Sequence, residues 1–224
     1  MNASGFMDNF LAADLYGITS SSHSRGRTNL DVVRQMITAG IKVIQYREKE
    51  KPIREMYAEC QAVRDLTRQA GVTFIVNDRV DLAMAVDADG IHIGQTDLPP
   101  QIVRQLIGNN KILGLSTHSM AEIQAAAASG IADYIGVGPV FSTDTKKDAS
   151  SPVGLHLVRY AAEYSKLPFV VIGGIKTANI VQVKCAGASV FAIISEIVSA
   201  EDIPVAVASL RRQLAIDNVN IQVD

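Results

Sequence analysis

The stretch YIGVGPVFSTDTKK, Tyr134–Lys147, indicates both the fold of the chain and the place of its functional site. Its first part mixes glycine with β-branched residues, as short buried strands of parallel sheets do. The strand pattern stops at Pro139, and a loop rich in hydroxyl and lysine side chains follows. Such donors at the end of a buried strand predict a loop over a phosphorylated ligand, with an ordinary solvated loop as the alternative.

The same order of strand and helix repeats on both sides of this stretch. Further strands are expected at 14–20, 42–49, 72–77, 90–94, 111–117, 169–174 and 189–195. Helices are expected after the strands, at 29–39, 52–70, 80–86, 99–107, 120–129, 152–166, 177–185 and 203–214. Eight such repeats predict a single-domain (β/α)8 TIM barrel, with an open doubly wound sheet as the alternative. The barrel is expected to span residues 14–216, between a short N-terminal lead-in at 1–13 and a polar tail at 217–224.

Composition narrows the class of protein. The 224 residues are 48% hydrophobic but only 5% aromatic, which suits the aliphatic core of a parallel α/β fold. A net charge of −2 gives no general attraction to nucleic acid or to a membrane surface, so neither is an expected partner. The two cysteines show no metal-ligand spacing, and the first residues lack a signal-peptide pattern. A cytoplasmic protein with reduced thiols is therefore expected.

Three polar side chains end the second expected strand. Gln45, Arg47 and Lys49 are two residues apart, so the period of a strand places them on one face. Two cations on an inward face are costly unless an anion compensates them. Ion pairs with Glu48 or Glu50 are the alternative, although those acids have the opposite parity. Because barrel active sites lie at the carboxyl ends of the strands, these residues predict an anion site.

Acidic residues follow the next two strands. Asn77 and Asp78 end the third strand, and Asp97 follows the fourth after a short loop. Neighbouring parallel strands lie about 4.8 Å apart, so both carboxylates can reach one ion. Two hard carboxylates without a Cys/His set predict Mg²⁺, which takes further ligands from phosphate oxygens and water. Three other acids are interpreted as helix caps or solvated residues: Asp81, Asp87 and Asp89.

The remaining strand ends carry hydroxyl groups and glycines. Ser116 ends the fifth strand outside any G-x-S-x-G turn, so it is expected to donate a hydrogen bond rather than act as a nucleophile. His118 follows it as either an acid–base group or a structural residue. Gly173–Gly174 ends the seventh strand and Ile194–Ser195 the eighth, where backbone amides of barrel loops often bind a monophosphate.

Two different anion sites are thus predicted at one rim. The acid pair with Arg47, Lys49 and Lys146 suits a metal-bound diphosphate, and Thr143, Thr145 and Ser195 suit a monophosphate. A metal-bound diphosphate is a good leaving group, so a transfer reaction that releases pyrophosphate is expected. The chain has no P-loop pattern, which argues against hydrolysis of a nucleoside triphosphate.

The chain resembles the thiamine-phosphate synthase family along nearly the whole barrel. Seven ordered motifs carry the resemblance: QYREK at 45–49, VNDRVDLA at 76–83, DGIHIGQTDLP at 89–99, GLSTHS at 114–119, DYIGVGPVFSTDTK at 133–146, IGGI at 172–175 and IIS at 193–195. The resemblance implies Mg²⁺-dependent joining of 4-amino-5-hydroxymethyl-2-methylpyrimidine diphosphate to a thiazole phosphate. It further implies a dissociative mechanism, in which pyrophosphate leaves first and the thiazole nitrogen captures a pyrimidine methyl cation.

The resemblance also implies a role for each matching position. The pyrimidine diphosphate would be held by Gln45, Arg47, Lys49, Asn77, Ser116 and Lys146. Asp78 and Asp97 would bind Mg²⁺. The thiazole phosphate would be held by Thr143, Thr145, Gly174, Ile194 and Ser195. Four of these residues would act in catalysis by stabilising the departing pyrophosphate: Arg47, Lys49, Ser116 and Lys146.

Two alternatives use the same barrel. One is a thiazole tautomerase with a histidine at the position of His118, which needs neither metal nor diphosphate. The other is a non-catalytic regulator that binds thiazole phosphate. Neither explains why the acid pair and the cations of the diphosphate site occur together. Phe191 and Glu196 depart from the smaller residues that family members often carry, but the neighbouring Ile194–Ser195 pair is intact.

Overall fold

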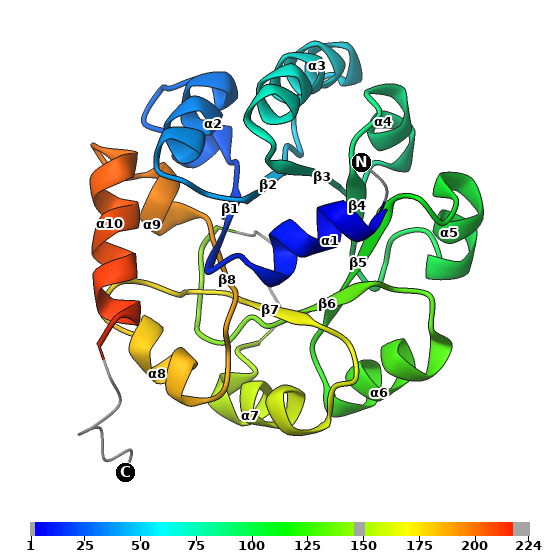
Figure 1. The fold of residues 1–224 in the computed structure, drawn as a ribbon, viewed down its shortest axis with the longest axis vertical. Helices are drawn as coiled ribbons and strands as arrows, with labels where there is room; N and C mark the ends of the chain where they lie inside the picture. Colours follow the sequence, from blue (N-terminus) through cyan, green and yellow to red (C-terminus); the bar gives the residue numbers. More distant parts are fainter. Residues whose placement is uncertain (1–2, 146–150, 217–224) are drawn as a thin grey trace.

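The computed structural model describes residues 3–145 and 151–216 as a closed parallel barrel surrounded by helices (Figure 1). Its strands follow chain order around the barrel, and β1 pairs with both β2 and β8. They are β1 (Leu15–Ile18), β2 (Val43–Tyr46), β3 (Thr73–Asn77), β4 (Gly90–Ile93), β5 (Ile112–Thr117), β6 (Tyr134–Val137), β7 (Phe169–Ile172) and β8 (Phe191–Ile193). The (β/α)8 prediction is confirmed, and the open doubly wound sheet is excluded by the closure between β1 and β8.

Helices cover the outside of the barrel (Figure 1). They are α2 (Asn29–Thr38), α3 (Ile53–Ala70), α4 (Val80–Ala85), α5 (Pro100–Ile107), α6 (Met120–Ser129), α7 (Gly154–Tyr164), α8 (Ile180–Cys185), α9 (Ser195–Val198) and α10 (Ile203–Leu214), with a 3-10 turn η1 at Ser21–His23. Local caps set several ends. The Thr28 hydroxyl accepts from the Asp31 amide at the start of α2, and Gly71 ends α3 with φ of 65°.

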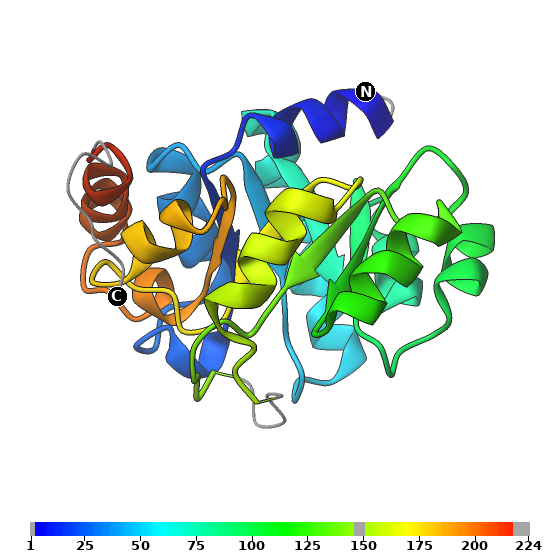
Figure 2. The ribbon, with the colours of Figure 1, turned by 90° about the horizontal axis from the view of Figure 1, so that it is seen from below.

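The barrel interior has its own apolar core, separate from the larger core between strands and helices. Helix α1 (Ala3–Leu11) lies across one end of the barrel (Figure 2). Its Phe10 is 1% exposed and packs on Tyr134 with ring centroids 4.5 Å apart. The Asn9 amide donates to Gly71 O and Thr73 Oγ1 at the start of β3, so α1 closes the amino-terminal end of the strands. The tail at 217–224 lies outside the described residues.

One expectation about the acids is wrong. Asp89 is 2% exposed and is neither a cap nor solvated. Its carboxylate lies 2.7 Å from an Arg64 guanidinium nitrogen and accepts from the Phe74 amide at 2.9 Å. By contrast, the Asp81 and Asp87 side chains are 62% and 69% exposed and form surface ion pairs. None of the described helices is long and apolar enough to span a bilayer.

Candidate functional site

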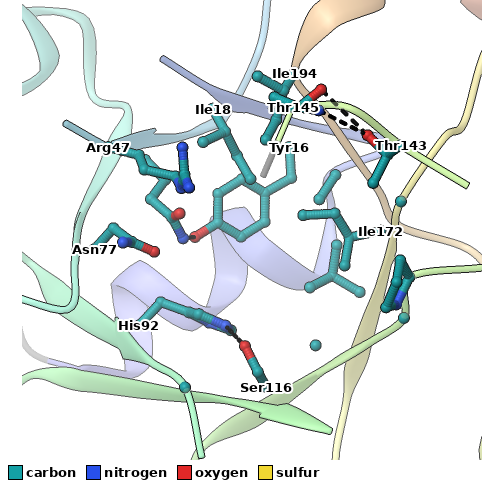
Figure 3. A pocket seen from close by; sticks show the side chains of 18 of the residues that line it. Tyr16, Ile18, Arg47, Asn77, His92, Ser116, Thr143, Thr145, Ile172 and Ile194 are labelled. Carbon is teal, nitrogen blue, oxygen red and sulfur yellow. Dashed lines mark hydrogen bonds between the residues drawn. The ribbon is translucent and has the colours of Figure 1, made fainter. Parts of the chain in front are cut away.

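A cavity of about 490 Å³ opens at the carboxyl ends of the strands (Figure 3). It is lined by all the predicted site residues that fall within 3–145 and 151–216: Gln45, Arg47, Lys49, Asn77, Asp78, Asp97, Ser116, Thr143, Thr145, Gly174, Ile194 and Ser195. Lys146, which was also predicted, lies outside the described residues. Residues from β2 to β8 and their loops thus meet in one place, as a parallel barrel requires.

The alternation along β2 sends Gln45, Arg47 and Lys49 toward the cavity, as expected. The ladder ends at Tyr46, three residues earlier than predicted, because the Arg47 amide donates to the Thr19 hydroxyl instead of to a neighbouring strand. Burial lowers the pKa of Arg47 from its ordinary value, while the nearby carboxylates of Asp78 and Glu48 oppose that change. A partly desolvated cation at the wall of the cavity is well placed to bind an anion.

The two candidate metal ligands lie close enough to interact. Lys49 Nζ is 2.7 Å from Asp78 Oδ2, so the ion pairs with Glu48 or Glu50 that were the alternative are not needed to explain Lys49. Burial alone would raise the pKa of Asp78, but the hydrogen bond and charge of Lys49 outweigh it and the net pKa is lowered. Burial raises the pKa of Asp97, and the Asp78 charge adds to the rise. Gly94 N donates to Asp97 Oδ2 at 2.7 Å.

This donor set fits a divalent cation with an incomplete protein shell. Within the described ranges, no three His, Cys, Asp or Glu residues are grouped to hold a metal. Mg²⁺ is commonly bound by one or two carboxylates together with waters and substrate phosphate oxygens. The mutual repulsion that raises the Asp97 pKa is relieved when a cation lies between two carboxylates. Asp78 and Asp97 therefore suit Mg²⁺ better than they suit a closed structural site.

The other wall of the cavity is made by the loops after β6, β7 and β8. Thr143 Oγ1 donates to Thr145 Oγ1 at 3.2 Å, a hydrogen bond within the loop after β6. Gly174 has φ of 62°, and a Cβ there would lie 2.6 Å from Ser142 O, so only glycine allows these two loops to touch. Glu196 Oε1 accepts from the Thr177 amide and hydroxyl at 2.9 and 2.8 Å. The unusual Glu196 thus joins the loop after β7 to α9.

His92 was missed by the sequence reasoning. It projects from the middle of β4 into the cavity, with Nε2 2.9 Å from Ser116 Oγ and Nδ1 2.9 Å from Tyr134 Oη. The signal was present in GIHIG, because Ile91 and Ile93 pack outward against helices and strand alternation then turns His92 inward. Tyr16 of β1 also lines the cavity and was not predicted.

His118 is held by the loop after β6. Its Nδ1 lies 2.5 Å from Gly138 O, and a carbonyl oxygen can only accept, so Nδ1 carries the hydrogen. Its backbone N–H donates to the Glu122 carboxylate at 2.5 Å. The first contact holds the imidazole at the cavity wall, and the second holds the backbone of His118.

Comparison with known proteins places these features in a family. The family model for thiamine monophosphate synthase matches residues 15–197. The chain is 57% identical over 205 residues to a thiamine-phosphate synthase from Pelotomaculum thermopropionicum, covering 92% of this chain and 94% of the relative. It is 48% identical to the thiamine-phosphate synthase of Caldicellulosiruptor saccharolyticus, with 87% of each chain covered. A solved thiamine phosphate pyrophosphorylase from Pyrococcus furiosus is 38% identical, with a TM-score of 0.81 over 90% of this chain and 95% of that chain.

Proposed function

The chain belongs to the thiamine monophosphate synthase family and is a transferase of thiamine biosynthesis; from this premise we propose the reaction and the residues that carry it out. The proposed reaction joins 4-amino-5-hydroxymethyl-2-methylpyrimidine diphosphate to a thiazole phosphate and releases pyrophosphate. One observation carries the proposal. A single cavity has an acid pair with Arg47 and Lys49 on one side, and Thr143, Thr145 and Ser195 on the other. Both phosphorylated substrates can therefore be held with their reacting atoms facing each other.

The diphosphate side is proposed to stabilise the leaving group. Asp78 and Asp97 would hold Mg²⁺, which when bound neutralises charge on the diphosphate. Arg47 and Lys49 add positive charge at the place where negative charge grows as the C–O bond breaks. Lys146 is proposed to join them, on the strength of its motif alone. Lys49, now paired with Asp78, can turn to the diphosphate once a cation takes over that carboxylate.

Neutral groups are proposed to help hold the pyrimidine diphosphate, and the Ser116 hydroxyl is proposed to help stabilise the departing pyrophosphate. Gln45 is 3% exposed at the floor of the cavity, and Asn77 and Ser116 line its wall. Their positions support a dissociative mechanism, because a departing anion needs donors and charge rather than a strong base. The thiazole phosphate, held beside the pyrimidine, is then positioned to capture the methyl cation before water does.

Five residues are proposed to hold the thiazole phosphate: Thr143, Thr145, Gly174, Ile194 and Ser195. The contact between Gly174 and the Phe141–Ser142 backbone brings the loops after β6 and β7 together. Neither alternative function gains support from the comparisons, in which the relatives named above are two thiamine-phosphate synthases and a thiamine phosphate pyrophosphorylase. The decisive assay is pyrophosphate release from the two substrates, with Mg²⁺ and with EDTA. Release that is unaffected by EDTA would contradict the metal part of the proposal, and no release would contradict the reaction.

Ser195→Ala is expected to raise the KM for thiazole phosphate by about three- to tenfold and to leave kcat within about twofold. The hydroxyl is one donor among several, and a neutral hydrogen bond contributes about 0.5–1.5 kcal/mol. Steady-state kinetics with each substrate varied in turn would measure this. Ser199→Ala, just beyond the end of α9, is the matched control and should change neither constant. A rise in the KM for the pyrimidine diphosphate, with the KM for thiazole phosphate unchanged, would contradict the placement of Ser195 at the thiazole phosphate.

Lys146→Ala is expected to act mainly on kcat, lowering it by about tenfold to a hundredfold. A cation that meets charge developing in the transition state affects turnover more than ground-state binding. Lys166→Ala serves as the control, because Lys166 is exposed and lies before β7, at the end of the strand opposite the cavity. Steady-state kinetics at saturating substrates would decide, and an unchanged kcat would count against a catalytic role for Lys146.

The proposed location is the cytoplasm. Cys60 is a free thiol buried in the core. Free thiols fit a reducing compartment. The proposed partners are the two small-molecule substrates, with neither nucleic acid nor membrane.

A further inference from the structure

Five side chains form a continuous line of hydrogen bonds from the floor of the cavity to its wall. Gln45 Nε2 donates to Tyr16 Oη at 2.9 Å, and Tyr16 Oη lies 3.0 Å from Tyr134 Oη. Tyr134 Oη lies 2.9 Å from His92 Nδ1, and His92 Nε2 lies 2.9 Å from Ser116 Oγ. Figure 3 shows the hydrogen bond between His92 and Ser116 and the ring of Tyr16 in the same cavity. The five residues come from five different strands.

The two tyrosines must each use their single proton within the line. Tyr16 and Tyr134 are 1% and 0% exposed. Burial raises the pKa of both hydroxyls well above the ordinary value, so each keeps its proton at neutral pH. A buried O–H without an acceptor would lose the hydrogen bond that it makes to water in the unfolded chain. Each tyrosine is therefore a donor to one neighbour and an acceptor from the other.

The amide of Gln45 gives the line a direction. Its Nε2 can only donate, so Tyr16 Oη is an acceptor at that contact. Within the described ranges, the other hydrogen-bond partner of Tyr16 Oη is Tyr134 Oη, so Tyr16 donates its proton there. Tyr134, already accepting from Tyr16, donates to His92 Nδ1. With Nδ1 accepting, the imidazole carries its hydrogen on Nε2 and donates it to Ser116 Oγ.

We infer that Tyr16, Tyr134 and His92 are positioning residues that orient the Ser116 hydroxyl toward the diphosphate substrate. Because Ser116 Oγ accepts from His92, its own proton is directed away from His92 and into the cavity, toward an acceptor atom of the substrate. A donor that is oriented before the substrate binds needs no reorganisation during the reaction. The identity of that substrate rests on the proposed function, whereas the tautomer of His92 does not.

The tautomer can be measured without any substrate. In ¹⁵N-histidine-labelled protein, the Nε2 of His92 is expected to show the shift of a protonated nitrogen and Nδ1 that of an unprotonated one. The chain has four histidines, so the His92 signals are assigned by their loss in His92→Gln. A protonated Nδ1 with an unprotonated Nε2 would reverse the donor and acceptor roles of His92 and overturn the inference. This result stands whether or not the protein releases pyrophosphate, so it separates a failure of the inference from a failure of the proposed function.

Steady-state kinetics test whether this line of hydrogen bonds contributes to turnover. Tyr134→Phe removes the donor to His92 Nδ1 and is expected to lower kcat about tenfold, which is the effect of one hydrogen bond on a reacting group. Tyr46→Phe is the matched control, because Tyr46 is equally buried but its hydroxyl donates to Glu59 outside the cavity. Thermal unfolding of both variants separates lost stability from lost turnover. A kcat for Tyr134→Phe within twofold of that for Tyr46→Phe would overturn the inference.

A double variant separates positioning from a general structural effect. If Tyr134 acts through Ser116, then Tyr134→Phe should cause less than a twofold further loss of kcat once Ser116→Ala is present. A structural role would instead lower kcat by the same factor in both backgrounds. Equal losses in the two backgrounds would therefore overturn the inference.

Discussion

Asp78→Asn is expected to lower Mg²⁺-dependent pyrophosphate release by about 1,000-fold or more. The substitution removes the charge that a divalent cation needs, and the cation is proposed to contribute several kcal/mol to the departure of the diphosphate. Asparagine is the right replacement because Asp78 has φ of 60°, a conformation that Asn adopts more readily than most residues. Asp78→Ala would add backbone strain to the lost charge and make the result ambiguous.

Asp81→Asn is the control for this experiment. It lies three residues along the chain in α4, is 62% exposed, and pairs with Arg79 on the surface. Its activity and Mg²⁺ dependence should match wild type. Direct titration with Mg²⁺ in the presence of pyrophosphate should show weaker Mg²⁺ binding by Asp78→Asn than by wild type, and no change for Asp81→Asn. If Asp78→Asn keeps a third or more of the wild-type rate at the same Mg²⁺ concentration, Asp78 is not a metal ligand.

The second large effect is on stability: Asp89→Asn is expected to lower the free energy of unfolding by about 3–5 kcal/mol. The Arg64 guanidinium is 7% exposed at the side chain and would be left buried without its counter-charge. The Phe74 amide would also lose a charged acceptor. Asn has nearly the same volume as Asp, so no cavity contributes. Urea unfolding followed by circular dichroism would measure the change.

Asp87→Asn is its matched control, two residues away. The Asp87 side chain is 69% exposed, and its pairs with Lys111 and Arg68 are surface pairs, which contribute about 0–1 kcal/mol. Asp87 also has positive φ, which Asn tolerates. Similar small losses in the two variants would mean that the buried pair contributes no more than the surface pairs do. Asp89 lies at the start of β4, away from the cavity, so the folded fraction of Asp89→Asn should keep its turnover.

The contrast between Gln45–Lys49 and Asp89 explains how far the sequence could predict the structure. Strand alternation is a local property, so the parity of Gln45, Arg47 and Lys49 already placed them on the cavity face. The partner of Asp89 is Arg64 on α3, 25 residues away, and no local pattern specifies that contact. The same alternation turns His92 into the barrel, but one histidine between two isoleucines is not a run of polar residues like that at Gln45–Lys49.

Pairings between strands set the rest of the site. The contact between Lys49 and Asp78 joins residues 29 apart, and that between His92 and Ser116 joins residues 24 apart. Both depend on the register of neighbouring strands, which the sequence does not state. Helix α9 was not predicted because its four residues are too short to show a helical period.

Helix α1 has a practical consequence for any surface-bound form of the protein. It lies over the amino-terminal ends of the strands (Figure 2). The cavity opens at the opposite, carboxyl ends. A solid support or fluorescent label attached at the start of α1 would thus be separated from incoming substrates by the length of the barrel. In a protein anchored through α1, the opening of the cavity would face the bulk solution.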